Sequence, residues 1–338
     1  MDPFRFSTQA VRARDQKAAW TEWFQPVFDV HAAGAHKQGF EANYLIWDFP
    51  EFSFTRVSAP ATRSVRSAMN LRRCPVDHWV ITYCQRGDTA YSANNLQLNA
   101  RAGVPFVWSL GQFSDSHRVA SDRLQLYLPR DSFSEIGGSL DAAVGSILQT
   151  GPGQLLAEFM LLLQRNLPNL TTEEAARLPN AVRAMVAACI APSAERCMIA
   201  SPQVGITILE KIRRAVRKNL RSPSLRPDEL CREVGLSRSQ LYRALENEGG
   251  VARYIQRHRL AESFALLCDV SENRSIADVA ASLCFPDPSS FSRAFRREFD
   301  MAPAEVREVT RSGVSPTKQR QHQSVLQRQR FSDFLQGY

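Results

Sequence analysis

The chain has 338 residues, of which 44% are apolar and 22% charged, values that are ordinary for a globular protein of about two domains. We expect neither a membrane-spanning helix nor a secretory signal, because no run of about 18 apolar residues occurs and the first residues lack a charged-then-apolar pattern. The seven cysteines are scattered without CxxC pairs, which favours a reduced, cytoplasmic protein over a disulfide framework.

The net charge of +8 is unevenly distributed along the chain. Gly205–Tyr338 contains 23 Lys and Arg against 16 Asp and Glu, whereas Met1–Val204 contains 19 against 18. A basic segment beside a nearly neutral one indicates an electrostatic partner such as nucleic acid, although many basic faces are merely solvated.

Residues 1 to about 135 are predicted to be rich in strands. Residues 78–112 alternate apolar and polar side chains and break at turn signals such as Arg86-Gly87-Asp88. Leu124–Arg130 is predicted to be one more strand. Short strands at such spacing predict a sandwich or a barrel, which we place at about 40–135.

The period of the apolar residues changes to that of helices from about residue 152 onward. Helices are predicted within 152–191, which completes an N-terminal domain over 1–192, and residues 193–203 form a linker. An all-α domain follows at 204–311, and a basic Gln- and Arg-rich tail at 312–338 is either loose or weakly helical. Helices in this second domain are predicted over Ile206–Asn219, Pro227–Val234, Arg238–Glu246, Val251–Leu267, Ser275–Leu283 and Pro288–Phe299. The fold class is therefore α+β.

The all-α domain contains two similar units, Asp228–Leu245 and Ile276–Phe295. In each unit a short helix and a tight turn precede a second helix. This is the helix-turn-helix arrangement, whose second helix can lie in the major groove of DNA. Gly235 suits the first turn, because glycine accepts a positive φ without steric penalty.

Both second helices carry start signals. Ser237 and Gln240 have the spacing of a capping box. Asp287 is the expected N-cap of the other helix, with Pro288 as its first residue.

The second helix of each unit has an apolar face and a polar face. Phe291, Phe295 and Phe299 recur every four residues and are predicted to pack in the core. The polar side chains opposite are candidate DNA contacts, because serine allows close approach and arginine can bind guanine or phosphate. Arg293 could contact either a base or a phosphate, whereas Arg297 is either a phosphate contact or a surface charge. The candidates are Ser289, Ser290, Ser292, Arg293, Arg296 and Arg297 in the second unit and Arg238, Ser239, Gln240, Tyr242 and Arg243 in the first.

These residues resemble the AraC family of bacterial transcription regulators. The resemblance runs from Val204 to about Arg307, and its most specific part is "FPDPSSFSRAFRREF" at Phe285–Phe299. It implies two helix-turn-helix units joined by a long helix, double-stranded promoter DNA and RNA polymerase as partners, and a homodimer. The strand-rich part resembles, more loosely, the cupin-like β-barrel sensor domain of the family, followed by dimerisation helices. That implies an activator that responds to a small-molecule effector.

The sequence departs from the family pattern at a few positions. Cys284 stands where glycine is usual at the second turn, and Asp300 where glycine usually ends the last helix. Pro286 and Cys231 are further departures. A non-glycine residue with a positive φ costs roughly 1 kcal/mol or somewhat more, so the second turn is either strained or different in shape.

Other functions fit the sequence less well. The histidines include no HxH pair, and the early cysteines are not clustered, so we expect no enzyme activity, no metal and no cofactor. A redox sensor using Cys231, Cys268 or Cys284 is an alternative, as is an N-terminal domain that serves only dimerisation. Trp79, Tyr83 and Trp108 either line a pocket or pack in the core.

Overall fold

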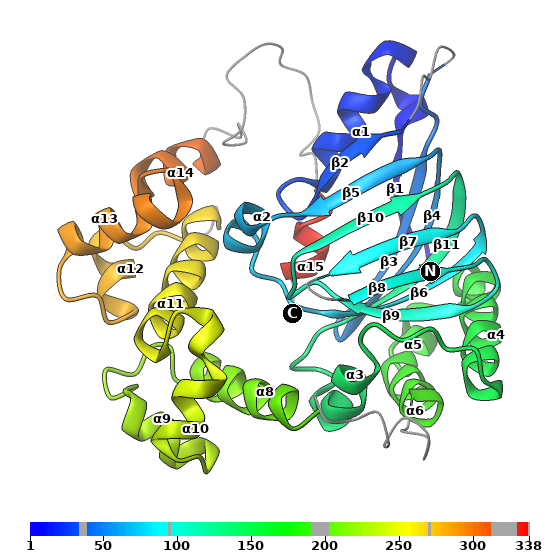
Figure 1. The fold of residues 1–338 in the computed structure, drawn as a ribbon. Coiled ribbons are helices and arrows are strands. Elements are labelled where there is room, and N and C mark those ends of the chain that lie inside the picture. Colours follow the sequence, from blue (N-terminus) through cyan, green and yellow to red (C-terminus); the bar gives the residue numbers. More distant parts are fainter. Residues whose placement is uncertain (34–38, 94–95, 191–202, 270–271, 312–329, 337–338) are drawn as a thin grey trace. The chain divides into compact units, whose positions relative to one another are not determined.

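The computed structural model describes residues 1–33, 39–93, 96–190, 203–269, 272–311 and 330–336. These residues form two compact units, and each is described here by itself. The N-terminal unit holds the strands with helices α1, α3–α6 and α15, and the C-terminal unit holds helices α8–α14 (Figure 1). Within the described ranges, no helix is long and apolar enough to cross a membrane.

The strands of the N-terminal unit form two antiparallel sheets, ordered β1-β3-β4-β11-β6-β9 and β2-β5-β10-β7-β8. The larger sheet consists of β1 (Phe4–Ser7), β3 (Asn43–Phe49), β4 (Phe52–Ala59), β11 (Ser121–Leu128), β6 (Trp79–Arg86) and β9 (Pro105–Ser109). The smaller consists of β2 (Asp29–Ala32), β5 (Thr62–Arg66), β10 (Ser114–Arg118), β7 (Thr89–Ala93) and β8 (Leu96–Ala100).

The predicted α+β class, with a strand-rich first part and a helical second part, is confirmed. Strand pairings in the described part of the chain stay within each sheet, so the strands form two open sheets, a sandwich, and not one closed barrel. A sandwich and a barrel use the same turns. Turn signals in a sequence therefore indicate where strands end but do not distinguish the two arrangements.

The two faces of the larger sheet differ in chemistry, as β11 illustrates. Successive side chains of a strand point to opposite faces. Leu124, Leu126 and Leu128 lie on one face and belong to an apolar core that the sheet shares with helices. Arg123, Gln125 and Tyr127 lie on the other face, between the two sheets, and are also buried. One apolar core therefore lies outside the sandwich, and the interior of the sandwich combines buried aromatic side chains with buried polar ones.

Helices cover the leucine face of the larger sheet (Figure 1). Leu156, Met160 and Leu163 of α4 pack there with Val182 and Val186 of α6. The helical region expected within 152–191 is thus present. The helices are α3 (Gly137–Ala143), α4 (Gly151–Asn166), α5 (Thr172–Ala175) and α6 (Leu178–Ile190).

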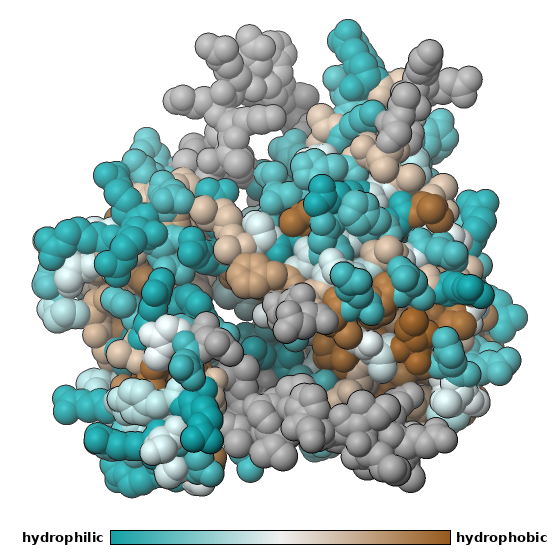
Figure 2. All heavy atoms as spheres, viewed as in Figure 1, coloured by the Kyte–Doolittle hydropathy of each residue, from teal (hydrophilic) through white to brown (hydrophobic). Residues whose placement is uncertain are grey.

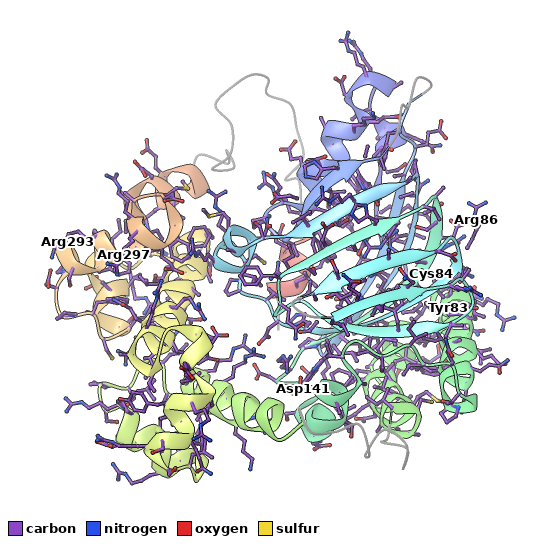
Figure 3. The ribbon with its side chains drawn as sticks, in the orientation of Figure 1. Tyr83, Cys84, Arg86, Asp141, Arg293 and Arg297 are labelled. Atoms are coloured by element: carbon purple, nitrogen blue, oxygen red, sulfur yellow. The ribbon has the colours of Figure 1, made fainter. Side chains whose placement is uncertain are left out.

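A buried polar cluster fixes α3 on the sheet. Asp141, labelled in Figure 3, accepts hydrogen bonds from Trp79 Nε1 and from Arg130 Nη1, each at 2.8 Å. The guanidinium of Arg130 also lies over the ring of Trp79, 4.2 Å from its centroid. A buried charge is tolerated when it is paired and hydrogen-bonded, as here.

Two helices precede or interrupt the strands, α1 (Gln16–Phe24) and α2 (Ala68–Arg73), and the sequence pattern did not predict either. Trp20, Trp23 and Phe24 of α1 are buried. Their spacing in the sequence does not distinguish a short helix from the strands around it. In the structure, Asp15 at the start of α1 makes no capping hydrogen bond, so this helix lacks one of the usual start features.

The C-terminal end of the chain packs into the N-terminal unit. Its short helix α15 (Asp333–Gln336) is preceded by Phe331, which is 1% exposed. Phe331 lies against the rings of Phe24, Tyr44 and Tyr127 at centroid distances of 5.3–5.5 Å. Further along, the carbonyl of Leu335 is 3.0 Å from His78 Nε2. The tail was predicted as loose or weakly helical. Residues 312–329 lie outside the described part, but residues 330–336 form an integral part of this unit.

The C-terminal unit is all-α, as predicted; its helix bounds lie within a few residues of the predicted ones, except that α14 was not predicted. They are α8 (Gln203–Lys218), α9 (Pro227–Val234), α10 (Arg238–Ala244), α11 (Val251–Cys268), α12 (Ile276–Ser282), α13 (Pro288–Phe299) and α14 (Pro303–Arg311). The predicted linker at 193–203 lies almost entirely outside the described residues.

The C-terminal unit has two apolar cores that share one helix. The first half of α11, through Tyr254 and Ile255, packs with Leu230 of α9 and Leu241 of α10. The second half packs with α12 and α13 in a separate core that includes Leu260, Phe264, Phe291, Phe295 and Phe299. Because one continuous helix contributes to both cores, it fixes the two helix pairs relative to each other.

Candidate DNA-binding surface

The two predicted helix-turn-helix units have the same turn. After α9, Gly235 takes a φ of 68°, and the next residue, Leu236, donates its N–H to Cys231 O at 3.0 Å. After α12, Cys284 takes a φ of 60°, and Phe285 donates its N–H to Ala280 O at 3.1 Å. A left-handed residue followed by a hydrogen bond back across five residues is the Schellman motif. The alignment of Gly235 with Cys284 made from the sequence is therefore correct at the level of individual hydrogen bonds.

Cys284 accordingly sits in a conformation that suits glycine. Replacing Cys284 with glycine is expected to stabilise the C-terminal unit by about 1 kcal/mol, because an L-residue in this region costs roughly 1–2 kcal/mol. The mirror change, Gly235→Ala, is expected to destabilise it by about the same amount through backbone strain alone, because a Cβ there would meet nothing within 4 Å. Urea unfolding followed by circular dichroism at 222 nm measures both. If Cys284→Gly leaves the free energy of unfolding unchanged, the contact of Cys284 Sγ with Arg221 O, at 3.3 Å, offsets the strain.

Both second helices begin at the predicted caps. Ser237 Oγ accepts a hydrogen bond from Gln240 N at 3.3 Å, and Gln240 Oε1 accepts one from Ser237 N at 3.0 Å, which completes a capping box. Asp287 Oδ1 accepts from Ser290 N at 2.7 Å. This backbone hydrogen bond lowers the pKa of Asp287 below its ordinary value, so the cap is anionic at neutral pH. Each cap is worth about 1 kcal/mol to its helix.

Helix α13 has the two faces that the sequence predicted. Phe291, Phe295 and Phe299 are buried in the second core. Arg293 and Arg297 are exposed and one helical turn apart, so they lie on the same side of α13 (Figure 3). The visible face of the whole unit is mostly hydrophilic (Figure 2). A helix held by its aromatic face and exposing arginines has the geometry needed to lie along DNA.

Comparisons with known proteins identify proteins that are similar to this chain in sequence or in fold. A family model described as a helix-turn-helix domain matches residues 230–308. The HTH-type transcriptional activator RhaS of Klebsiella pneumoniae is 36% identical over 83 residues, which cover 24% of this chain and 29% of RhaS. RhaS of Yersinia pestis is 37% identical over 81 residues, 23% of this chain and 29% of its own. The chain therefore spans about 29% of the length of the curated relatives that it matches.

A solved structure covers more of the chain. The AraC-like transcriptional activator CuxR is 28% identical, with a TM-score of 0.55, over 83% of this chain and 99% of the CuxR chain. The C-terminal unit is an AraC-type helix-turn-helix domain. The resemblance stated from the sequence is thereby confirmed, and the likeness to CuxR extends it to the two-part architecture.

Within the AraC-type domain, intramolecular bonds engage several candidate residues of α13. Ser290 Oγ donates to Asp287 O at 3.0 Å, and Ser292 Oγ donates to Pro288 O at 2.8 Å. Arg296 pairs with Glu305 of α14 at 3.4 Å. The serine hydroxyls therefore already have acceptors within their own helix, which leaves Ser289, Arg293 and Arg297 as the exposed side chains best placed to reach DNA.

Candidate residues of the corresponding helix α10 also make bonds within the unit. Arg238 donates to both carboxylate oxygens of Asp228, at 2.6 and 2.8 Å, and this pairing lowers the pKa of Asp228. The side chain of Gln240 is held in the capping box, so it would have to leave the cap to read an adenine. Tyr242, Arg243 and Ser239 are exposed. Of the five candidates on α10, Arg238 is therefore held in an ion pair and Gln240 in the cap.

Sequence reasoning did not identify Asp228 and Glu305 as partners of the candidate arginines. Each lies on a neighbouring helix, ten residues before Arg238 or nine residues after Arg296. Charge spacing within one helix is readable from sequence, but pairing across a turn depends on the crossing of two helices. An acidic residue opposite an exposed arginine also has a consequence, because DNA phosphates must compete with it for the guanidinium.

Proposed function

We propose that this protein is a sequence-specific DNA-binding transcription regulator, an activator that responds to a small molecule bound by its N-terminal unit. The observation that carries the proposal is the pair of capped helices, α10 and α13, each held by an apolar face and each exposing arginine on the other. Arg243 belongs to the first helix and Arg293 and Arg297 to the second. Such side chains supply both phosphate contacts and two-point hydrogen bonds to guanine.

The length of α11 supports simultaneous use of both helices. At a rise of 1.5 Å per residue, a helix of 18 residues is about 27 Å long. Successive major grooves on one side of a duplex lie about 34 Å apart. Since α11 packs in both cores, it would hold α10 and α13 at a fixed separation of the right order.

Activation is supported by the similarity to RhaS and CuxR, both of which are transcriptional activators. An activator bound beside a promoter is expected to contact RNA polymerase. For an effector to switch it, the effector must bind more tightly to the arrangement that is competent for DNA or for polymerase.

We further propose that the protein is a homodimer that uses α4. Leu155 and Leu162 of this helix are 51% and 48% exposed, and Phe159 lies between them on the same helical face. The other helix that the sequence suggested, α6, buries Val182, Val186 and Ile190 against its own unit and contributes no such stripe. Leu162→Glu should convert a dimer to a monomer in light-scattering measurements; an unchanged mass would exclude this face.

The main alternative is a regulator whose N-terminal unit serves only dimerisation, or whose DNA binding responds to oxidation. Among the cysteines named for the redox version, Cys231 and Cys284 lie in or beside helix packing at intermediate exposure. The partly polar interior of the sandwich favours a binding role for the N-terminal unit over pure dimerisation, because a scaffold has no need of buried polar groups there.

A map of the sites that the full-length protein occupies on its own genome tests the function. We expect occupancy upstream of a limited set of promoters, and deletion of the gene should lower their transcription. Random occupancy would refute sequence-specific binding, and increased transcription would refute activation. A variant with Cys231, Cys268 and Cys284 all replaced by alanine should retain the same map. Loss of an oxidant-dependent change in that variant would support the redox alternative.

A further inference from the structure

The space between the two sheets contains a small cavity of about 20 Å³, which a ligand larger than water enters only when the lining side chains move apart. Side chains from both sheets, from α1 and from the segment after α1 line it. They are Trp20, Phe24, Phe28, Val30, Thr62, Ser64, Trp108, Arg118, Arg123, Gln125 and Tyr127. Of the three aromatic residues that the sequence left open, Trp108 lines this cavity. The lining combines an aromatic part with a part that carries two arginines.

Arg118 and Arg123 enter the cavity from opposite sheets. Arg118 is the last residue of β10 in the smaller sheet, and Arg123 lies in β11 of the larger sheet, beside an irregularity in its pairing with β6. They are only 7% and 5% exposed. Both guanidinium groups donate to serine hydroxyls: Arg118 Nη1 donates to Ser64 Oγ at 3.3 Å, and Arg123 Nη1 to Ser121 Oγ at 3.0 Å. The buried Nε atoms of both arginines have no hydrogen-bond acceptor in the structure.

Two other buried arginines of the same unit show how a structural arginine is accommodated. Arg66 donates to the carbonyls of Leu110, Val27 and Val76 at 2.6–2.9 Å. Arg130 pairs with the carboxylate of Asp141. A guanidinium has five N–H groups and no acceptor, so burial without such partners is costly. The Nε atoms of Arg66 and Arg130 therefore have carbonyl acceptors, whereas those of Arg118 and Arg123 have none.

The tyrosines near Arg118 add no negative charge at neutral pH. Burial and the nearby Arg123 lower the pKa of Arg118 to about 10. Burial raises the pKa of Tyr91 to about 12 and that of Tyr127 also well above its usual value. The cavity consequently holds two like charges, which a bound anion would neutralise.

We propose that this cavity binds a small organic anion, with Arg118 and Arg123 together holding its carboxylate or phosphate group. Arginine pairs are suited to both groups, because each guanidinium can donate two parallel hydrogen bonds. The proposal rests on the proposed function, since it names the chemical class of the effector. It assigns the effector a negative head and an apolar body.

The aromatic part of the lining is where the body of the ligand would lie. Trp20, Phe24, Phe28 and Trp108 form this part. Phe331 of the C-terminal segment contacts Phe24, Phe28 and Tyr127, three of the lining residues, and so stabilises the lining. A ligand in this cavity therefore lies directly beside the segment that ends the chain.

The test uses the full-length protein and tryptophan fluorescence. The chain has five tryptophans, Trp20, Trp23, Trp47, Trp79 and Trp108, all of them in the N-terminal unit, so the signal reports on this unit alone. The probes are butyrate, butyl phosphate and 1-butanol, which have similar apolar chains of three or four carbons and differ in the head. We expect saturable fluorescence changes and a higher melting temperature with one or both anions. The difference between butyrate and butyl phosphate distinguishes a carboxylate from a phosphate ligand, and butanol should have no comparable effect.

Arg118→Met and Arg123→Met should each weaken the anion response about thirtyfold or more, because removing one partner of a buried charged contact carries such a loss. Both variants should also melt at a higher temperature than the wild type without any anion, since they remove an unsatisfied buried charge. Arg63→Gln, which changes an exposed ion pair with Asp115 on the neighbouring β5–β10 surface, is the matched control and should respond like the wild type. Equal responses to butanol and the anions, retained responses in the methionine variants, or no response to either anion would overturn the proposal.

DNA binding measured on the same samples separates the two proposals. Methionine variants that still bind DNA but ignore the anions would locate the effect in the cavity. Wild-type protein that binds the anions but no DNA would refute the proposed function and leave the anion site standing.

Discussion

Arg293→Ala is expected to relax the preference of the protein for one or two base pairs, and Arg297→Ala to weaken binding to all sequences alike. Arg293 is nearer the start of α13, where a recognition helix approaches the base edges most closely. A two-point contact between arginine and guanine discriminates by about 1–3 kcal/mol, which is roughly a 5- to 150-fold change in relative affinity. Arg297, one turn further along, is assigned to a phosphate, whose loss carries no sequence information.

The measurement is a set of binding titrations against a duplex with the preferred site and against its single-base-pair variants. Arg86→Ala is the control for loss of one positive charge, because Arg86 is an exposed residue of the N-terminal unit (Figure 3). It should leave affinity and preference unchanged. If Arg293→Ala and Arg297→Ala both lower affinity uniformly, Arg293 does not read a base, and the base contacts would have to come from Ser289 or from α10.

Phe331→Ala is expected to lower the free energy of unfolding of the N-terminal unit by about 3–5 kcal/mol, the range for truncating a fully buried phenylalanine. The ring lies among Phe24, Phe28, Tyr44 and Tyr127, and its backbone N–H also donates to Trp23 O at 3.2 Å. Removing the ring would leave a cavity between α1 and the sheets. Because Phe331 is separated in sequence from every one of these partners, the loss would identify the C-terminal segment as part of the folded unit.

Urea unfolding followed by tryptophan fluorescence measures this loss in the full-length protein. Phe113→Ala is the matched control, since Phe113 is 50% exposed and its truncation should change stability by no more than about 0.5 kcal/mol. A change below about 1 kcal/mol in Phe331→Ala would mean that the segment does not stabilise the unit in solution.

The parts of the fold that the sequence predicted well are those with local signals. The capping box of Ser237 and Gln240, the cap at Asp287 and the left-handed turn at Gly235 all involve residues within a few positions of each other. Their physical causes lie in backbone geometry and in short hydrogen bonds, which a sequence displays directly. Cys284 belongs to the same class, because repetition of the unit revealed a glycine position that cysteine occupies.

The parts that could not be predicted depend on contacts between distant residues. The order of strands in the two sheets and the docking of Phe331 beside α1 result from packing of segments that are far apart in the chain. The same is true of the arginine pair in the cavity. Arg118 and Arg123 are near in sequence, but only the separation of β10 and β11 into different sheets makes them face one space. For the DNA-binding surface, the sequence supplied the helices and the polar residues, whereas only the structure identified Asp228 and Glu305 as competitors for their charges.

The most direct test of DNA recognition is the affinity of the full-length protein for a duplex from its own occupied sites, compared with a scrambled duplex of equal length, at several salt concentrations. We expect affinity for the site to exceed that for the scrambled duplex by at least about 10³-fold. It should also fall steeply between about 50 and 200 mM salt, because arginine–phosphate contacts release counterions. Equal affinity for both duplexes, or an affinity that does not change with salt, would contradict recognition of DNA through α10 and α13.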